Sequence, residues 1–198
     1  MISTVAALYV DPRGPYPALV TEWYDEARDA RTYAGPWPVV EHPPCGAWGQ
    51  MSHLHKRDDA WCAAHAIDMV RRFGGVLEHP AWSRIFDAYG LPRPGELPDS
   101  HGGRTYALEQ VAWGHPCRKP TWLYVVGVDP AVVMRGMRSG GAPTHQIWCS
   151  KSSPSHGRNG KLKGAHAGMR RRSPVAFATW LVEIASHARV THEHAKEK

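Results

Sequence analysis

Two side chains able to do covalent chemistry follow short apolar segments in this 198-residue chain. Cys45 comes after residues 37–40 and a stiff His-Pro-Pro turn, and Glu78 follows Val76-Leu77 and precedes a turn stopped by Pro80. A thiol can attack carbon, and a carboxyl group beside it can assist proton transfer. The pair predicts nucleophilic chemistry, although each residue alone also fits a buried structural cysteine or a surface acid.

The elements that must position these residues can be read from apolar runs and turn residues. Strands alternating with helices predict an α/β fold, with a Rossmann-like, mostly parallel sheet flanked by helices in one compact domain over residues 1–198. Functional groups then lie at the carboxyl ends of the strands. Strands are expected at 5–10, 37–40, 76–77, 106–112 and 121–128, and helices at 58–72 (capped by Asp58 or Asp59), 82–89 and 174–188, whereas 22–33 fits either state.

Basic residues dominate the second half of the chain, whose formal net charge is +6. No Asp or Glu occurs from Pro130 to Val182. A one-sided cationic stretch suits the phosphates of DNA, because neutralising them releases counterions, although a solvated basic loop is the alternative. We expect a flexible basic loop at 139–168 and a frayed tail at 190–198. The predicted nucleic-acid contacts are Arg158, Lys161, Lys163, Arg170, Arg171 and Arg172.

Several function classes are disfavoured by composition. No apolar run approaches the ~20 residues that span a bilayer, and the first ten residues do not form a secretion signal. We therefore expect a cytoplasmic protein, not bound to membranes, and a monomer. The four cysteines form no CxxC pair, and no metal is expected. A zinc site remains an alternative at His53, His55, Cys62 and His65, whose spacing obeys known sites only loosely.

Three motifs in register resemble those of DNA cytosine-C5 methyltransferases, in particular the small phage-type members. His42-Pro-Pro-Cys45-Gly is similar to the family's Pro-Cys motif, and Leu77-Glu78-His79-Pro80 is similar to its Glu-Asn-Val motif. Residues 112–127 resemble the segment in which arginines precede a hydrophobic strand. The helix expected from Pro174 resembles the closing helix of the phage-type members.

The resemblance implies a covalent mechanism on a flipped-out cytosine. Cys45 would add to C6 of the ring, and Glu78 would hydrogen-bond N3 and the exocyclic amine. C5 would then attack a one-carbon donor. Arg118 and Lys119 would meet phosphate or the base carbonyl.

The resemblance also implies S-adenosylmethionine as the cofactor. Asp11 and Gly14 stand in the loop after the first strand, Glu22 and Trp23 would contact ribose and adenine, and Asp29 (or Asp25) would add an acidic contact. That loop holds one glycine and three prolines over 11–17, where the family has a glycine-rich loop. Two alternatives stay open, a pyrimidine-C5 enzyme with another donor and a non-catalytic nucleic-acid-binding protein.

Overall fold

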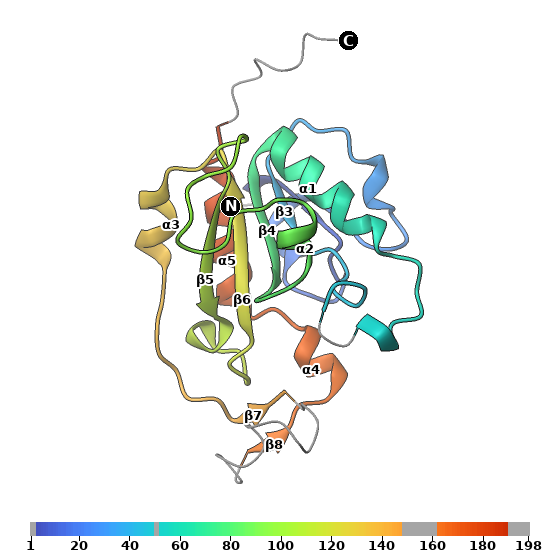
Figure 1. Ribbon diagram of the computed structural model, residues 1–198, viewed down its shortest axis with the longest axis vertical. Helices are drawn as coiled ribbons and strands as arrows, with labels where there is room; N and C mark the ends of the chain where they lie inside the picture. Colours follow the sequence, from blue (N-terminus) through green and yellow to red (C-terminus); the bar gives the residue numbers. More distant parts are fainter. Residues whose placement is uncertain (1–2, 50–51, 148–161, 190–198) are drawn as a thin grey trace.

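One six-stranded sheet organises the chain in a computed structural model that describes residues 3–49, 52–147 and 162–189 (Figure 1). The strand order is β2-β1-β3-β4-β6-β5, with the first four strands parallel and the last two antiparallel to their neighbours. The predicted α/β class, with a mostly parallel Rossmann-like sheet in one compact domain, is confirmed. The strands are β1 (Ser3–Leu8), β2 (Val20–Tyr24), β3 (Val39–Glu41), β4 (Gly75–Pro80), β5 (Arg104–Glu109) and β6 (Pro120–Val126).

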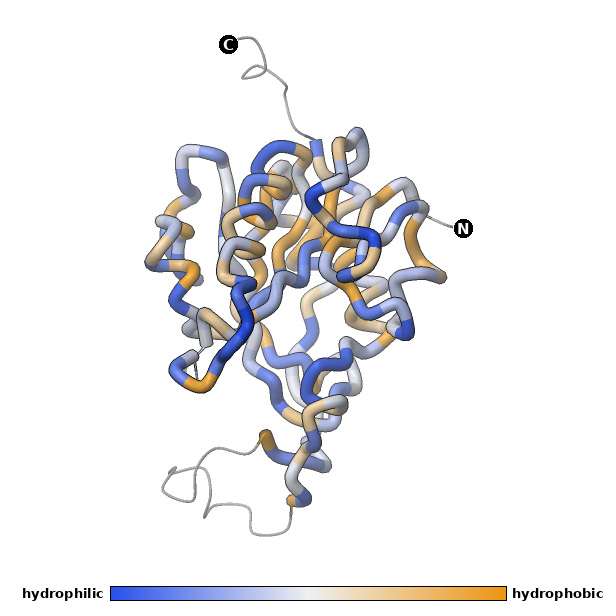
Figure 2. Tube along the Cα trace, turned by 90° about the vertical axis from the view of Figure 1, so that its right-hand side faces the viewer, coloured by the Kyte–Doolittle hydropathy of each residue, from blue (hydrophilic) through white to orange (hydrophobic). Residues whose placement is uncertain are grey.

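Two helices cover the two faces of this sheet (Figure 1). Helix α1 (Trp61–Phe73) packs on β3, β4 and β6, and helix α5 (Val175–Ser186) packs on β1, β3 and β4. Each face buries its own apolar cluster, and hydrophobic segments run through the interior of the molecule (Figure 2). Every large apolar side chain buried there contributes roughly 1.5–3 kcal/mol. The burial of both faces therefore fixes the strand ends that carry the candidate site.

Alternation along β3 and β4 decides which face each polar side chain joins. Val40 and Val76 pack on the α5 side of the sheet. Because side chains alternate with a period of two, His42 and Glu78 continue that same face two residues later. Gly75 allows β4 to begin close to β3, since a Cβ there would lie 2.0 Å from the carbonyl oxygen of Val39. The close pairing of β3 and β4 brings the two segments that bear Cys45 and Glu78 side by side.

Short elements complete the described chain. A two-stranded pair β7–β8 and helix α4 lie below the sheet in Figure 1. The short elements are η1 (Tyr16–Ala18), η2 (Ala30–Thr32), η3 (Ser52–Leu54), η4 (Gln110–Trp113), α2 (Ile85–Ala88), α3 (Pro130–Gly136), β7 (His145–Gln146), β8 (Lys163–Gly164) and α4 (Ala167–Arg171).

Several predicted element boundaries need correction. Helix α1 is confirmed, but Ala60 is its first flanking residue and has no side-chain cap, while Asp59 bonds to His55 at 2.6 Å instead of capping. The helix predicted over 82–89 is the shorter α2, and the strand predicted over 106–112 ends at Glu109, where η4 begins. Helix α3 has no counterpart among the predicted elements.

The undecided segment and the predicted flexible segments can also be placed. Residues 22–33 contain the end of β2, followed by turns and η2, so this segment forms local hydrogen-bonded turns in place of an α-helix. Much of the predicted 139–168 loop, and the whole predicted tail at 190–198, lie outside the described residues. In the described part of the chain, no helix is long and apolar enough to cross a bilayer.

Candidate active site

Cys45 lies in the loop that follows β3, at the carboxyl end of the sheet. Its carbonyl oxygen accepts hydrogen bonds from the N–H groups of Trp48 (3.1 Å) and Gly49 (2.9 Å), which close the loop into a tight turn. A Cβ on Gly46 would lie 2.2 Å from the His55 ring, so no larger residue fits there without a shift. The Cys45 side chain is exposed. The thiol is therefore fixed in place and open to a substrate.

Glu78 lies on β4, the parallel neighbour of β3, with 7% of its surface exposed. Its Oε2 lies 2.9 Å from His42 Nδ1, and its Oε1 accepts a hydrogen bond from Gln110 Nε2 at 2.9 Å. Gln110 Nε2 also donates to Thr121 Oγ1 at 3.0 Å. Side chains from the β3 loop, η4 and β6 thus hold the carboxyl group of Glu78 in one orientation.

Charges link Cys45, Glu78 and Lys119 in one neighbourhood. Burial alone would raise the pKa of Glu78, but the Lys119 ammonium and the hydrogen bond from His42 outweigh it and lower this pKa to about 2. Although the Cys45 side chain reaches solvent, surrounding protein desolvates it, and desolvation together with the Glu78 charge raises the pKa of the thiol. Lys119 and Arg171 oppose that rise only in part. At neutral pH Cys45 is therefore a thiol beside an ionised Glu78.

The predicted catalytic residues do not all meet at this site. The structure brings Cys45, Glu78 and Lys119 together, whereas Arg118 is exposed and pairs with Glu109 at 3.4 Å. Lys119 has a positive φ of 45°, which is strained for a residue with a Cβ. Adjacent residues on this turn therefore face different surroundings, and Lys119 is the one whose charge acts on Cys45 and Glu78.

Sequence reasoning missed four residues of the site. Tyr16, His42, Gln110 and Thr121 belong to the same hydrogen-bonded network as Glu78. His42 stands inside the Pro-Pro-Cys motif and could have been singled out. Tyr16 and Gln110 lie outside the three motifs, and Thr121 lies inside the third without having been singled out, because only the strand order and register bring these residues to Glu78.

The loop after β1, where the resemblance would seat the methionine end of S-adenosylmethionine, forms a closed local turn. The carboxylate of Asp11 accepts from the backbone N–H of Arg13 at 2.9 Å and also pairs with its guanidinium. The N–H of Gly14 donates to the carbonyl oxygen of Asp11 at 2.8 Å. Three prolines in 11–17 have no N–H to offer. The amide cradle that an anionic ligand needs is therefore not formed by this loop.

The remaining predicted cofactor residues interact with residues that are close to them in the sequence. Glu22 accepts a hydrogen bond from the Tyr24 hydroxyl at 3.2 Å. Trp23 packs toward the α5 side while Tyr24 packs toward the α1 side, so Glu22 and Trp23 point to opposite faces. The Arg28 guanidinium lies 5.0 Å from the Trp23 ring centre.

Asp29, the last predicted cofactor residue, forms an ion pair of 2.6 Å with Arg31 and also caps the short helix η2. Each predicted ligand of the ribose or adenine therefore already has a partner nearby or points away from its neighbour. As placed here, these residues do not fit S-adenosylmethionine.

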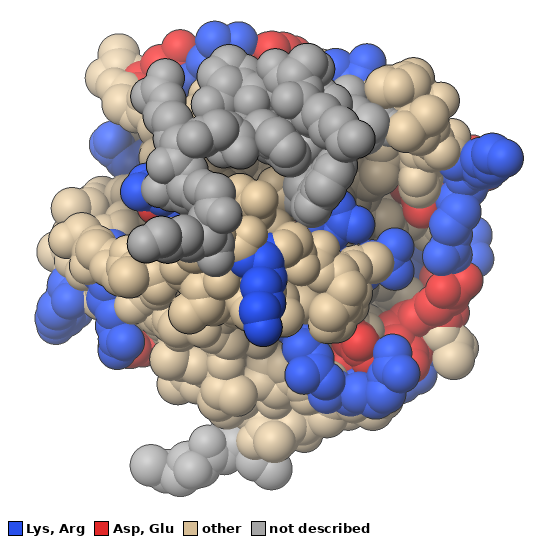
Figure 3. Space-filling view, turned by 90° about the horizontal axis from the view of Figure 1, so that it is seen from below, with Lys and Arg blue, Asp and Glu red and all other residues tan. Residues whose placement is uncertain are grey.

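Helix α4, which ends in Arg170 and Arg171 and is followed by Arg172, lies below the carboxyl ends of the strands (Figure 1). Positive charge from Arg171 acts on Cys45, that of Arg172 acts on Asp11, and that of Arg170 acts on Cys117. All three arginines are exposed, as is Lys163 on β8. Seen from this end, lysine and arginine side chains stand at many points of the face, with acidic ones mainly at one side (Figure 3). The predicted contacts Arg158 and Lys161 lie outside the described residues.

Two of the histidines of the alternative zinc site, His55 and His65, take other partners. His55 bonds to Asp59 at 2.6 Å, and His65 Nδ1 bonds to the Tyr9 hydroxyl at 2.8 Å. Cys62 is buried in α1. Within residues 3–49, 52–147 and 162–189, no three His, Cys, Asp or Glu side chains gather in a way that could hold a metal ion.

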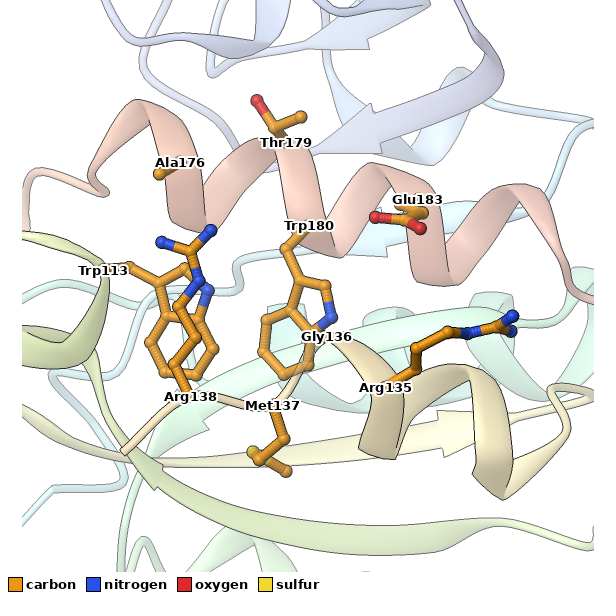
Figure 4. A pocket seen from close by; sticks show the side chains of 9 residues that line it. All are labelled: Trp113, Arg135, Gly136, Met137, Arg138, Ala176, Thr179, Trp180 and Glu183. Atoms are coloured by element: carbon orange, nitrogen blue, oxygen red, sulfur yellow. The ribbon is translucent and has the colours of Figure 1, made fainter. Parts of the chain in front are cut away.

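A hollow of about 390 Å³ lies between α3 and α5, and neither Cys45 nor Glu78 lines it (Figure 4). Trp113 of η4 and Trp180 of α5 stack there with ring centres 4.7 Å apart. Arg135 and Arg138 line the same hollow. The stack fixes η4 against α5. Because η4 also carries Gln110, which donates a hydrogen bond to Glu78, this packing helps to hold the Glu78 carboxyl group in its orientation.

No protein-family model, no curated protein and no solved structure matches the chain.

Proposed function

We propose that this protein is an enzyme that modifies C5 of a pyrimidine base in DNA through a covalent bond between Cys45 and C6 of the ring. The observation that carries the proposal is that the paired strands β3 and β4 bear an exposed thiol in the loop after β3 and a fixed carboxylate on β4, and that the Lys119 ammonium acts electrostatically on both. Open α/β sheets take their ligands at the carboxyl ends of the strands. The three groups come from the motifs that resemble those of DNA cytosine-C5 methyltransferases.

Each of the three groups has a role in this chemistry. The Cys45 sulfur forms a bond to C6, and the electrons of the C5=C6 double bond move into the ring, so that C5 becomes nucleophilic. Glu78 orients the ring through its Watson–Crick edge, and Lys119 stabilises the negative charge that develops on the ring. C5 then takes up a proton or another electrophile. Loss of a proton from C5 and departure of the sulfur restore the aromatic ring.

Burial and the neighbouring Glu78 charge determine how the reaction depends on pH. Because both raise the pKa of the Cys45 thiol, the thiolate is a minor species at neutral pH. Attack on C6 should therefore speed up about tenfold per pH unit until the thiol pKa is reached.

A polymeric substrate is supported by the cationic end of the molecule. Arg171 lies near enough to Cys45 to lower the pKa of the thiol, so a phosphate bound there would be next to the reacting base. A base in duplex DNA must leave the stack before a thiol can reach C6, at a cost of a few kcal/mol. Phosphate contacts from α4 would help to offset that cost.

Covalent activation of the ring is the core of the proposal, because the side chains at the β1–β2 end do not fit S-adenosylmethionine. Two base analogues separate attack from group transfer. An oligonucleotide carrying 5-azacytosine accepts a thiolate at C6 without any donor, so mass spectrometry should find the protein joined to it. An adduct with 5-fluorocytosine persists only when an electrophile has been added at C5, so it reports the donor.

The test of the proposal is the covalent mass of the wild-type protein beside that of Cys45→Ala. We expect the 5-azacytosine adduct in the wild type and none in the variant, and a faster reaction with duplex DNA than with the free nucleotide. A wild-type protein that binds the oligonucleotide but forms no adduct would overturn the proposal.

One observation favours the alternative of a non-catalytic nucleic-acid-binding protein. The raised pKa of the Cys45 thiol disfavours the thiolate that attack requires. If binding to DNA is unchanged in Cys45→Ala and no adduct forms at any pH up to 10, the binding function is the better account.

A further inference from the structure

A hydrogen-bonded row runs from the candidate site into the interior of the protein. The Tyr16 hydroxyl lies 2.5 Å from His42 Nε2, and His42 Nδ1 lies 2.9 Å from Glu78 Oε2. Tyr16 is 3% exposed and comes from η1, just after the proline-rich loop that follows β1. Gln110 holds the other carboxylate oxygen. Glu78 is thus held at both carboxylate oxygens by side chains that are themselves largely buried.

The protonation of Tyr16, His42 and Glu78 follows from the hydrogen-bond partners that these groups need. If His42 carried its proton on Nε2, the buried hydroxyl hydrogen of Tyr16 would have no acceptor that the described residues supply. If Tyr16 donates to Nε2 instead, His42 carries its proton on Nδ1 and donates it to Glu78. Burial raises the pKa of Tyr16 well above its ordinary value, which keeps the hydroxyl protonated. The second arrangement satisfies all three groups, and it leaves Glu78 ionised.

An ionised Glu78 surrounded by donors can only accept further hydrogen bonds. His42 and Gln110 each donate to it, and the Lys119 ammonium favours its charged form. Cytosine presents a bare N3 lone pair on its Watson–Crick edge, which repels a carboxylate oxygen, so an ionised Glu78 could accept a hydrogen bond only from the exocyclic amine of that ring. Uracil presents an N3–H at the same place, which a carboxylate oxygen accepts.

We propose, as a refinement that rests on the proposed function, that the row Tyr16–His42–Glu78 selects a uracil-type ring over cytosine. The covalent step balances without a further reagent. Cys45 first releases its thiol proton to water; the sulfur then bonds to C6, the C5=C6 electrons move to C4–C5, and the C4=O4 electrons move onto O4. The charge on O4 needs a nearby cation, and Lys119 is the cation whose charge already acts on both Cys45 and Glu78. C5 takes a proton from water, and the reversal with loss of the original hydrogen exchanges that hydrogen with solvent.

The exchange reaction gives the test, because it requires no donor. Two oligonucleotides of one sequence carry tritium at C5 of a single uracil or of a single cytosine, and tritium release to water is measured with the full chain. We expect release from uracil at least about tenfold faster than from cytosine, since cytosine leaves a buried hydrogen-bonding group of the site without a partner. Faster or equal release from cytosine would overturn the inference while leaving the proposed function standing. Silence on both rings would overturn both.

A single-atom change tests the part played by Tyr16. Tyr16→Phe keeps the buried ring and removes the hydroxyl that biases His42, so the preference for uracil should shrink to about threefold or less. Tyr24→Phe is the matched control, because it removes a hydroxyl that bonds to Glu22 on β2. It should leave the preference unchanged. A preference in Tyr16→Phe equal to that of the wild type would overturn the role assigned to Tyr16.

Discussion

The carboxyl ends of β3–β4 and of β1–β2 differ in how their polar side chains are paired. At the β3–β4 end, Glu78 bonds to His42, 36 residues away, and to Gln110, 32 residues away. At the β1–β2 end, the acidic residues predicted to bind the cofactor pair with residues only two positions away: Asp11 with Arg13, Glu22 with Tyr24, and Asp29 with Arg31. Local pairs form whatever the rest of the chain does, and they occupy the groups a ligand would need. The distant network exists only because the fold assembles it.

The loop after β1 connects these two ends. A backbone hydrogen bond from Gly14 to Asp11 closes its turn, and the loop places the Tyr16 hydroxyl beside His42. A loop that resemblance assigns to a cofactor therefore contributes a buried hydroxyl to the neighbouring site. The comparison suggests that the β3–β4 end does the chemistry and that the β1–β2 end supports it.

The largest effect should come from Cys45. Cys45→Ala removes the nucleophile, so adduct formation with 5-azacytosine DNA and tritium release should both fall to background. Cys62→Ala removes a buried thiol of α1 and is the matched control. Mass spectrometry and scintillation counting measure the two outcomes, and equal loss in both variants would mean that Cys45 has no special role.

Glu78 should dominate the dependence of stability on pH. Its pKa is lowered from an ordinary value of 4.5 to about 2, so its ionised form stabilises the fold above pH 4.5, and this contribution is lost as the pH falls toward 2. The shift corresponds to about 3 kcal/mol. Urea unfolding at pH 7 and pH 3 should show a smaller difference in Glu78→Gln than in the wild type. An equal difference would mean that Glu78 is not held as a carboxylate.

The three arginines at the end of α4 and directly after it should have a moderate effect on DNA affinity. Replacing Arg170, Arg171 and Arg172 by glutamine should weaken duplex binding and lower the slope of log affinity against log salt, by up to about one unit per lost phosphate contact. Arg104→Gln is the control, because Arg104 begins β5 at the opposite end of the sheet. Fluorescence anisotropy at several salt concentrations measures the slope. A slope unchanged in the triple variant would remove α4 from the DNA interface.

The smallest effect should come from the β1–β2 end. Glu22→Gln and Asp29→Asn break local pairs that are partly or fully exposed, which contribute little to stability. Both variants should form the 5-azacytosine adduct within about twofold of the wild-type rate, and calorimetry should detect no heat on adding S-adenosylmethionine. Clear binding heat that disappears in Glu22→Gln would reverse the comparison and restore a cofactor role to this end.

Much of the fold could be predicted from the sequence, because it depends on local patterns. The apolar run before His42, the apolar face of α1 ended by Gly74 and the closing helix α5 were all readable, and the α/β class followed from their alternation. Cys45 and Glu78 stood out for a similar reason, since each follows or ends a short apolar strand.

The tertiary structure alone decided how the candidate site works. Pairing of β3 with β4 in parallel, and of β4 with β6 in antiparallel, sets Glu78 beside His42 and near Lys119, and no local pattern encodes that register. The same pairing leaves Arg118 outside, although it is the sequence neighbour of Lys119. Residue type and spacing determined which groups could react, because they depend on short segments. Burial and long-range hydrogen bonds determined their protonation and partners, because these depend on atoms that come from distant parts of the chain.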